Sequence, residues 1–96
     1  MTTPVLSIDN TRDYNARTKS GLVVIDFYAD RCPPCKILSP KMDELALQYA
    51  GKVSFYKVNV DVANELAQSQ EITSLPTLLF YQNGVIASLV PVWVGS

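Results

Sequence analysis

The strongest apolar run in the chain spans residues 22–29, where Asp26 is the only charged residue. A run that is apolar on both faces is typical of a central strand that is covered on each side. Apolar residues then recur at spacings of four, three and four, which predicts a helix from about Lys36 to about Tyr49. Pro40 lies inside this helix and should bend it. The side chains that we expect the helix to bury are Leu38, Met42, Leu45 and Tyr49.

The remaining segments predict short elements of both kinds. Asn10 is a suitable N-cap for a helix that runs to about Lys19, and Gly21 can end it. Asn83-Gly84 favours the left-handed backbone of a two-residue hairpin turn, so antiparallel strands should flank it. The other predicted elements are strands at residues 5–9, 53–60, 77–82 and 85–90 and a helix at 64–70.

The predicted order of elements is therefore βαβαβαββ. Strands that are joined through helices pair in parallel, and the final hairpin adds antiparallel strands at one edge. We expect an α/β fold in which a mixed central sheet lies between two layers of helices. The length of 96 residues is that of one domain, so residues 1–96 should form a single unit.

The composition is that of a globular protein and argues against several classes of partner. The chain is 48% hydrophobic and 18% charged, and its net charge of −1, without a basic cluster, argues against binding to nucleic acid. No apolar run approaches the roughly 20 residues that span a bilayer, so we expect no membrane partner. The first residues lack the pattern of a signal peptide, which favours a cytoplasmic location.

The chain contains no histidine. This removes the usual general base near neutral pH and the commonest metal ligand, so we expect no metal site. No glycine-rich dinucleotide loop or phosphate loop is present, so we also expect no cofactor. Chemistry must then use cysteine, carboxylate, lysine or tyrosine side chains.

The only two cysteines, Cys32 and Cys35, are separated by Pro33-Pro34 at the predicted strand-to-helix junction. If Cys32 is the N-cap, the prolines take the first two helical positions, where a missing amide costs least. The Cys35 amide and the helix dipole then both favour a thiolate at Cys32. This arrangement predicts thiol–disulfide chemistry, in which Cys32 attacks a target disulfide and Cys35 resolves the mixed disulfide.

Three other interpretations of the cysteine pair are weaker. A structural disulfide here would close a very short loop, which gains least from loop entropy. A structural zinc site needs four ligands, and the chain offers two sulfurs and no histidine. Two incidental core cysteines would not explain the adjacent prolines at a helix start.

The residues around and beyond the cysteines form one extended pattern, Cys-x-Pro-Cys-Lys with a downstream Pro-Thr that opens a strand. This pattern is highly specific and closely resembles that of the thioredoxin family, and the match covers about residues 5–90 in one register. The resemblance implies the thioredoxin fold. The shared residues are Asp26-Phe27-Tyr28-Ala29, Cys32, Pro34-Cys35-Lys36, Pro40, Lys57, Asp61, Leu75-Pro76-Thr77 and Asn83-Gly84.

The resemblance implies a protein-disulfide reductase with an exposed Cys32 and a buried Cys35. Asp26 would lie beneath the cysteines and pass protons to and from Cys35. Burial in an apolar strand independently raises the pKa of such a carboxyl. A simple ion pair between Asp26 and Lys57 is the alternative. The two roles are compatible, because a nearby lysine moderates the pKa shift, and we count Lys57 with the catalytic residues.

Sequence alone favours an ordinary trans proline at Pro76, because cis bonds are only about 5–6% of X-Pro bonds. The resemblance instead implies a cis bond, which would place the Leu75 backbone where an extended target segment can bind. The target-binding residues that follow from the resemblance are Arg31, Pro33, Pro34, Val60, Ser74, Leu75 and Pro76.

Two residues beside the cysteines depart from the family pattern. Arg31 stands where thioredoxins usually carry tryptophan, and Pro33 replaces the usual glycine. We hypothesise that Arg31 favours the Cys32 thiolate and shifts target choice toward acidic partners. A solvated surface arginine is the alternative. Pro33 stiffens the loop and should alter the reduction potential.

The end of the chain departs further, because thioredoxins continue past the hairpin into an amphipathic helix that residues 89–96 do not provide. A missing C-terminal helix would uncover apolar surface on the sheet. The apolar tail could cover it, with Trp93 as the filler, or a second chain could do so, or the gene product could be truncated or alternatively ended. We therefore expect some self-association.

The leading prediction is reduction of disulfides in target proteins. The resemblance implies recycling by a thioredoxin reductase and a place in electron transport and cell redox homeostasis. The rival is a thioredoxin-fold interaction module with weak or impaired redox activity. An oxidase or isomerase shares the motif and differs in reduction potential.

Overall fold

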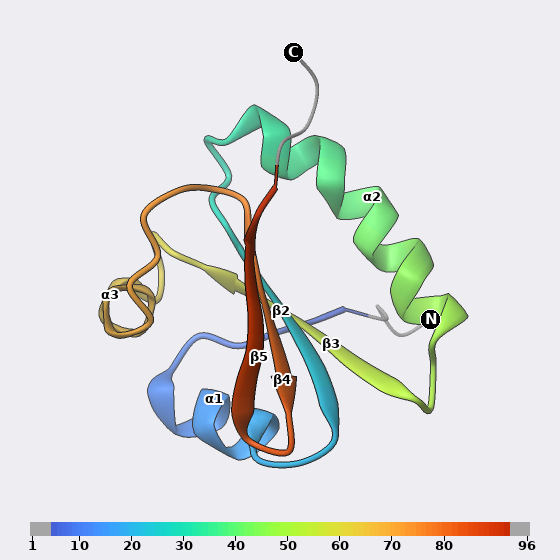
Figure 1. The fold of residues 1–96 in the computed structure, drawn as a ribbon. Helices are drawn as coiled ribbons and strands as arrows, with labels where there is room; N and C mark the ends of the chain where they lie inside the picture. Colours follow the sequence, from blue (N-terminus) through green and yellow to red (C-terminus); the bar gives the residue numbers. More distant parts are fainter. Residues whose placement is uncertain (1–4, 93–96) are drawn as a thin grey trace.

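The computed structural model describes residues 5–92 and has the element order βαβαβαββ (Figure 1). The predicted α/β class and order are therefore confirmed. The first strand is shorter than predicted, and the helix after the cysteines begins three residues earlier than Lys36. The elements are β1 (Leu6–Ser7), α1 (Thr11–Thr18), β2 (Leu22–Tyr28), α2 (Pro33–Gln48), β3 (Val53–Asn59), α3 (Asn64–Ser69), β4 (Thr77–Gln82) and β5 (Val85–Pro91).

The five strands form one mixed sheet in the order β1-β3-β2-β4-β5. β1, β3 and β2 pair in parallel, whereas β4 pairs antiparallel with both β2 and β5. β2 has a strand on each edge and packed side chains on each face, which explains its continuous apolar sequence. The predicted parallel core with an antiparallel hairpin at one edge is confirmed.

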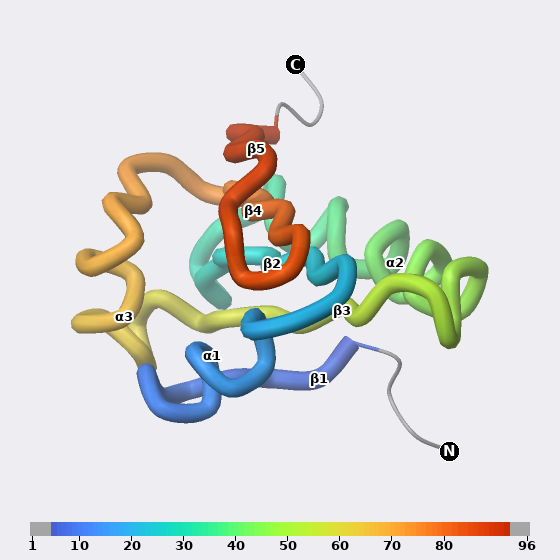
Figure 2. Tube along the Cα trace, turned by 60° about the horizontal axis from the view of Figure 1, so that its bottom comes forward, coloured from blue at the N-terminus to red at the C-terminus, as the bar shows by residue number. Residues whose placement is uncertain are grey.

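Helices cover both faces of the sheet. Successive side chains of β2 point to opposite faces, so they belong to two separate hydrophobic cores. Phe27 belongs to the core that contains Tyr14 of α1 and part of α3. Val24 belongs to the core that contains Met42 of α2. Figures 1 and 2 show α2 apart from α1 and α3, across the sheet. Asp26, two residues from Val24, therefore lies on the face toward α2.

The buried face of α2 differs from the prediction in its second half. Leu38 and Met42 are buried as predicted, but Leu45 and Tyr49 are 39% and 45% exposed. Ala46 takes the next core position. A step of four residues from Met42 keeps Ala46 in line with the buried stripe, and Leu45 then falls on the flank of the helix. The helical geometry outweighs the greater hydrophobicity of leucine.

The predicted caps and turns are present. The Asn10 side chain accepts the Asp13 amide at 2.8 Å and caps α1. Asn83 and Gly84 have φ values of 51° and 85°, as the hairpin turn requires. The Gly21 amide donates to Asn83 Oδ1 at 3.0 Å and so ties the entry of β2 to the hairpin.

No helix among residues 5–92 is long and apolar enough to cross a membrane. The expectation that Trp93 fills an uncovered face falls on residues 93–96, which lie outside the described residues.

Candidate active site

Cys32 is the N-cap of α2, and Pro33 and Pro34 occupy the first two helical positions. The backbone of Cys32 is extended, with φ −104° and ψ 103°, which is the conformation of an N-cap residue. The backbone amide of Cys35 donates a hydrogen bond to Cys32 Sγ at 3.3 Å. The predicted cap is confirmed, and the positive end of the α2 dipole lies at this sulfur, where it stabilises a thiolate.

Cys32 and Cys35 form a disulfide, and their Cα atoms lie 5.3 Å apart. Cys32 is 8% exposed and Cys35 is 4% exposed, so the expectation of an exposed Cys32 is wrong for this oxidised form. Cys32 nevertheless lines an open groove and Cys35 does not, so Cys32 is the more accessible of the two residues.

Asp26 lies in the middle of β2, and its side chain is only 4% exposed. Its Oδ1 atom has no hydrogen-bond partner among the described residues. Burial raises the pKa of Asp26 from 3.8 to about 6, and the positive charge of Lys57 acts in the opposite direction. A carboxyl with this pKa can take up and release a proton near neutral pH.

Lys57 occupies the position on β3 that is in register with Asp26. No ion pair joins the two side chains among the described residues. Lys57 Nζ instead lies 5.9 Å from the centre of the Tyr28 ring. The alternative in which Lys57 simply neutralises Asp26 in an ion pair is therefore wrong for this structure.

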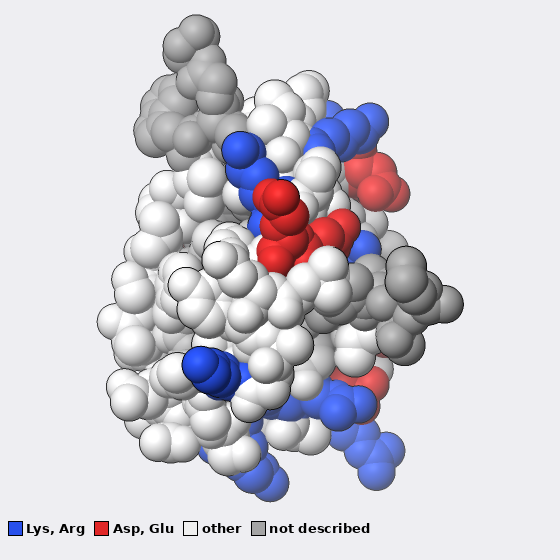
Figure 3. Space-filling model, turned by 90° about the vertical axis from the view of Figure 1, so that its right-hand side faces the viewer, with Lys and Arg blue, Asp and Glu red and all other residues white. Residues whose placement is uncertain are grey.

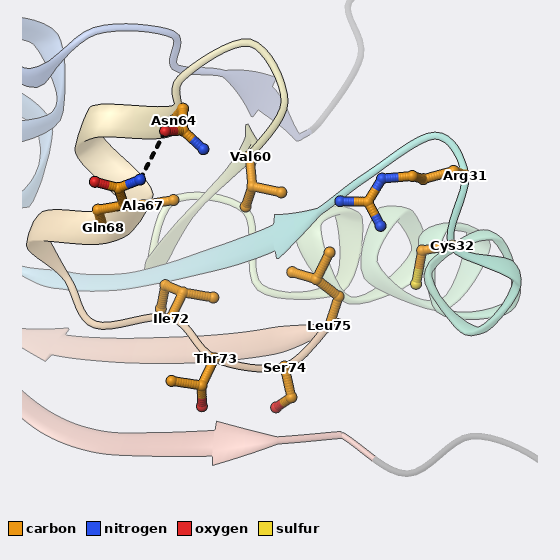
Figure 4. Close-up of a pocket in the computed structure, with 10 residues that line it drawn as sticks. All are labelled: Arg31, Cys32, Val60, Asn64, Ala67, Gln68, Ile72, Thr73, Ser74 and Leu75. Carbon is orange, nitrogen blue, oxygen red and sulfur yellow. Dashed lines mark hydrogen bonds between the residues drawn. The ribbon is translucent and has the colours of Figure 1, made fainter.

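An open groove of about 520 Å³ begins at Cys32 and extends to α3 and to the segment that leads into β4 (Figure 4). The predicted target-binding residues divide into two groups. Those that line the groove are Arg31, Val60, Ser74 and Leu75. Those that do not line it are Pro33, Pro34 and Pro76, because the first two lie in the opening turn of α2 and the third is fully buried.

Sequence reasoning missed the other side of the groove, which is formed by Asn64, Ala67, Gln68, Ile72 and Thr73. These residues belong to no motif. One topological signal could have found them: β2 and β3 are parallel neighbours, so the segments that follow their carboxyl ends meet at the same edge of the sheet. Cys32 follows β2 and α3 follows β3.

The peptide bond between Leu75 and Pro76 is cis, as the resemblance implied and as sequence alone did not favour. Two hydrogen bonds hold this segment. Thr77 Oγ1 donates to the Ser74 carbonyl at 2.7 Å, and the Val92 amide donates to the Pro76 carbonyl at 3.0 Å. The wall of the groove that carries Ser74 and Leu75 is therefore tied to β4 and to the end of β5.

Arg31 lies at the rim of the groove in an ion pair with Asp61, with Nη2 and Oδ1 3.2 Å apart. The two side chains are 68% and 51% exposed, so the pair contributes little to stability. Arg31 is thus a solvent-exposed arginine, and Asp61 contacts one side of its guanidinium group. Its effect on the Cys32 thiolate stays a prediction.

Together these groups support thiol–disulfide exchange. The cysteine pair can store two electrons as a dithiol and release them as a disulfide. A buried carboxyl that titrates near neutral pH lies on the face of the sheet toward α2, and a groove gives access to one of the two sulfurs. Within residues 5–92, no group of three or more His, Cys, Asp or Glu side chains is placed to hold a metal ion.

Comparison with known proteins gives a consistent result. The family model that matches the chain is Thioredoxin, over residues 5–91. Thioredoxin-T of Drosophila melanogaster is 42% identical over 89 residues, which cover 93% of this chain and 57% of that protein. Thioredoxin-2 of Saccharomyces cerevisiae is 40% identical over 82 residues, which cover 83% of this chain and 78% of that protein. The solved structure of Plasmodium falciparum thioredoxin has a TM-score of 0.86 and 32% identity, and the match covers 91% of this chain and 85% of that one.

Proposed function

The chain belongs to the thioredoxin family, and from this premise we propose that it is a protein-disulfide reductase. The observation that carries the proposal is the Cys32–Cys35 disulfide at the start of α2, with the Cys35 amide bonded to Cys32 Sγ and an open groove beside it. A dithiol in this setting has one sulfur that a target can reach and a second sulfur that closes the cycle.

In the reduced protein, the Cys32 thiolate attacks one sulfur of a target disulfide, and the other target sulfur leaves as a thiolate. Cys35 then loses its proton, attacks the Cys32 sulfur of the mixed disulfide and releases the second target thiol. Each cycle forms one protein disulfide and breaks one target disulfide, so two electrons and two protons pass to the target. The disulfide in the structure corresponds to the end of that cycle.

Asp26 is proposed as the group that accepts the Cys35 proton. Its side chain lies on the α2 face of β2, and its pKa of about 6 makes the ionised form available at pH 7. Lys57, in register on β3, lowers that pKa and so favours the ionised base. Asp26 therefore affects the step in which Cys35 attacks the mixed disulfide. Lys57 affects this step only by lowering the pKa of Asp26.

The groove is proposed as the binding site for an extended segment of the target. Val60, Ser74 and Leu75 line it together with Cys32, which suits a peptide laid beside Cys32. Arg31 at the rim would favour acidic residues in that segment, because its guanidinium has donors that Asp61 does not use.

Recycling needs an external donor of two electrons, and we propose a thioredoxin reductase for this role, with no further cofactor on the chain itself. Such a protein takes part in electron transport and cell redox homeostasis. A reducing compartment such as the cytoplasm fits this cycle, because the working form is the dithiol.

Weak self-association is proposed through the apolar flank of α2. Leu22, Leu45 and Tyr49 are 48%, 39% and 45% exposed and line a hollow of about 320 Å³ together with side chains of the sheet. Figure 3 faces the α2 side and shows a broad area without charged side chains. Apolar surface of this kind favours contact with a second apolar surface.

The redox proposal is tested by reduction of insulin with dithiothreitol as the electron source. The wild type should accelerate the reaction well above Cys32→Ser. Cys35→Ser keeps the attacking sulfur but cannot resolve, so it should accumulate a mixed disulfide with its target. A wild-type rate equal to that of Cys32→Ser would overturn the proposal and favour an interaction module. Equilibration with a glutathione buffer then separates a reductase from an oxidase by the reduction potential.

A further inference from the structure

The groove beside Cys32 has a second end that disulfide exchange does not use. Figure 4 shows Cys32 and Arg31 on one side of the groove and side chains of α3 on the opposite side. Asn64 and Gln68 come from α3 and are exposed to solvent. A target that reaches Cys32 and extends along the groove must therefore pass these two amide side chains.

The amide group of Asn64 is held in one orientation by Gln68. Gln68 Nε2 donates a hydrogen bond to Asn64 Oδ1 at 2.8 Å, from one turn of α3 to the next. This bond engages the oxygen of Asn64, and the Nδ2 amino group makes no hydrogen bond among the described residues. In Figure 4 this nitrogen points into the groove, toward Val60. The α3 end of the groove thus offers an oriented hydrogen-bond donor.

The surroundings of this donor select the kind of acceptor. The groove has a mixed lining, in which Val60, Ala67 and Ile72 are apolar and Gln68, Thr73 and Ser74 are polar. A peptide carbonyl that lies over the apolar part loses water and needs a donor to replace it. Arg31, at the opposite side, is the only charged residue that lines the groove among the described residues, so a carboxylate near Asn64 would gain no ionic contact.

We propose that Asn64, oriented by Gln68, binds a main-chain carbonyl oxygen of the target peptide at the end of the groove opposite Cys32. The contact makes the protein prefer extended peptide disulfides to small ones, and the inference rests on the proposed reductase function. Asn64 touches the target, whereas Gln68 acts through Asn64 and is a positioning residue. Neither residue takes part in the sulfur chemistry, so both affect the binding of target and not the rate of exchange once the target is bound.

The test uses pre-reduced protein in single-turnover reactions with two substrates. One is an extended, uncharged peptide that carries a disulfide, and the other is hydroxyethyl disulfide, which is too small to span the groove. Asn64→Leu should raise the half-saturation concentration for the peptide about three- to tenfold, as expected for one lost hydrogen bond. The limiting rate and the reaction with hydroxyethyl disulfide should stay unchanged.

Two further variants separate orientation from folding. Gln68→Glu cannot donate to Asn64 Oδ1, and its carboxylate instead accepts from Nδ2 and draws it out of the groove. It should raise the half-saturation concentration for the peptide without changing the limiting rate. Glu65→Gln is the matched control, because it exchanges the same two residue types in the opposite direction on the same helix. Glu65 lines a different hollow, so this variant should behave as the wild type.

The outcomes are distinguishable. If Asn64→Leu and Gln68→Glu both match the wild type on the peptide, Asn64 does not bind the target and the inference is overturned. Equal losses on both substrates would also contradict it, because they would assign the residues to the cysteine chemistry or to folding. A wild type that reduces neither substrate would instead overturn the proposed reductase function.

Discussion

Asp26 and Lys57 occupy matched positions on the parallel strands β2 and β3, yet no ion pair joins them among the described residues. The carboxyl of Asp26 is 4% exposed and its Oδ1 has no hydrogen-bond partner in that part of the chain. Burial disfavours the ionised form of the carboxyl. This effect outweighs the attraction of Lys57 and raises the pKa of Asp26 to about 6. A folded protein that keeps such a group is destabilised by its charge.

We expect Asp26→Asn to stabilise the protein at neutral pH. A carboxyl whose pKa rises from 3.8 to about 6 on folding costs about 3 kcal/mol when it is ionised, at 1.36 kcal/mol per pKa unit. The cost is absent below pH 3.8, grows between pH 3.8 and about 6 and is complete above that. Urea unfolding of the wild type and the variant should therefore converge at acidic pH and diverge by up to about 3 kcal/mol at pH 7.

The matched control for this prediction is Asp30→Asn, two residues after the end of β2 on an exposed position. It should leave the unfolding free energy within about 0.5 kcal/mol of the wild type at every pH. A constant difference between Asp26→Asn and the wild type from pH 3 to pH 8 would show that ionisation of Asp26 is not the cause.

The same carboxyl should appear in the pH dependence of the resolving step. Asp26 can accept the Cys35 proton only when it is ionised, so the rate of resolution should rise as pH increases through about 6. Asp26→Asn should lower the rate at pH 7 about a hundred- to ten-thousandfold and remove this inflection. Rapid-mixing measurements on a preformed mixed disulfide would check both effects. An unchanged profile in the variant would assign the proton transfer to another group.

A buried hydrogen-bond chain joins α1 to the end of α3 through β4. The hydroxyls of Tyr14 and Tyr81 lie 2.6 Å apart, and Tyr81 donates to Gln70 Oε1 at 3.2 Å. Tyr81→Phe leaves the buried Tyr14 hydroxyl without its partner and should cost about 2 kcal/mol, whereas Tyr14→Phe should cost about 1 kcal/mol. The double variant should cost less than the two single changes together.

Thermal or urea unfolding of the four proteins measures this coupling, and Tyr49→Phe on the exposed flank of α2 is the control that should change nothing. Strictly additive losses would mean that the two hydroxyls do not depend on each other.

The ion pair of Arg31 with Asp61 should influence target choice more than stability. Both side chains are more than half exposed, so Asp61→Asn should change the unfolding free energy by less than about 1 kcal/mol. Loss of Asp61 frees the guanidinium group, and kcat/KM for acidic peptide disulfides should rise about two- to fivefold at low salt, an effect that fades at high salt. Arg31→Gln should remove the preference for acidic over basic peptides. The hypothesis fails if both variants keep the wild-type ratio at low ionic strength.

The apolar flank of α2 predicts concentration-dependent association. Leu45 lines the hollow beside the sheet, whereas Leu47 is 68% exposed and lies outside it. Sedimentation equilibrium should show a mass that increases with concentration for the wild type and for Leu47→Lys, and a monomer for Leu45→Lys. A wild type that stays monomeric at every concentration, or a Leu47→Lys that behaves like Leu45→Lys, would contradict a specific role of the hollow.

The features that could be read from the sequence depend on neighbours along the chain. Cys32 caps α2 because the prolines and the Cys35 amide follow it within three residues. The turn at Asn83-Gly84 forms because those two residues adopt positive φ at low cost. The apolar residues next to Asp26 in the sequence also placed it in a buried strand, and this burial predicted the rise in its pKa. The local elements and the chemistry of the cysteine pair were therefore determined by the sequence itself.

The tertiary structure alone decided which distant residues meet. Sequence reasoning did not place Asn64 and Gln68 opposite Cys32, pair Arg31 with Asp61 across 30 positions, or keep Lys57 out of an ion pair with Asp26. Each outcome depends on strand register and on how neighbouring elements pack. Local propensity says which segment becomes a strand or a helix, but distances between side chains follow from the assembled sheet, and these distances shape the groove around Cys32.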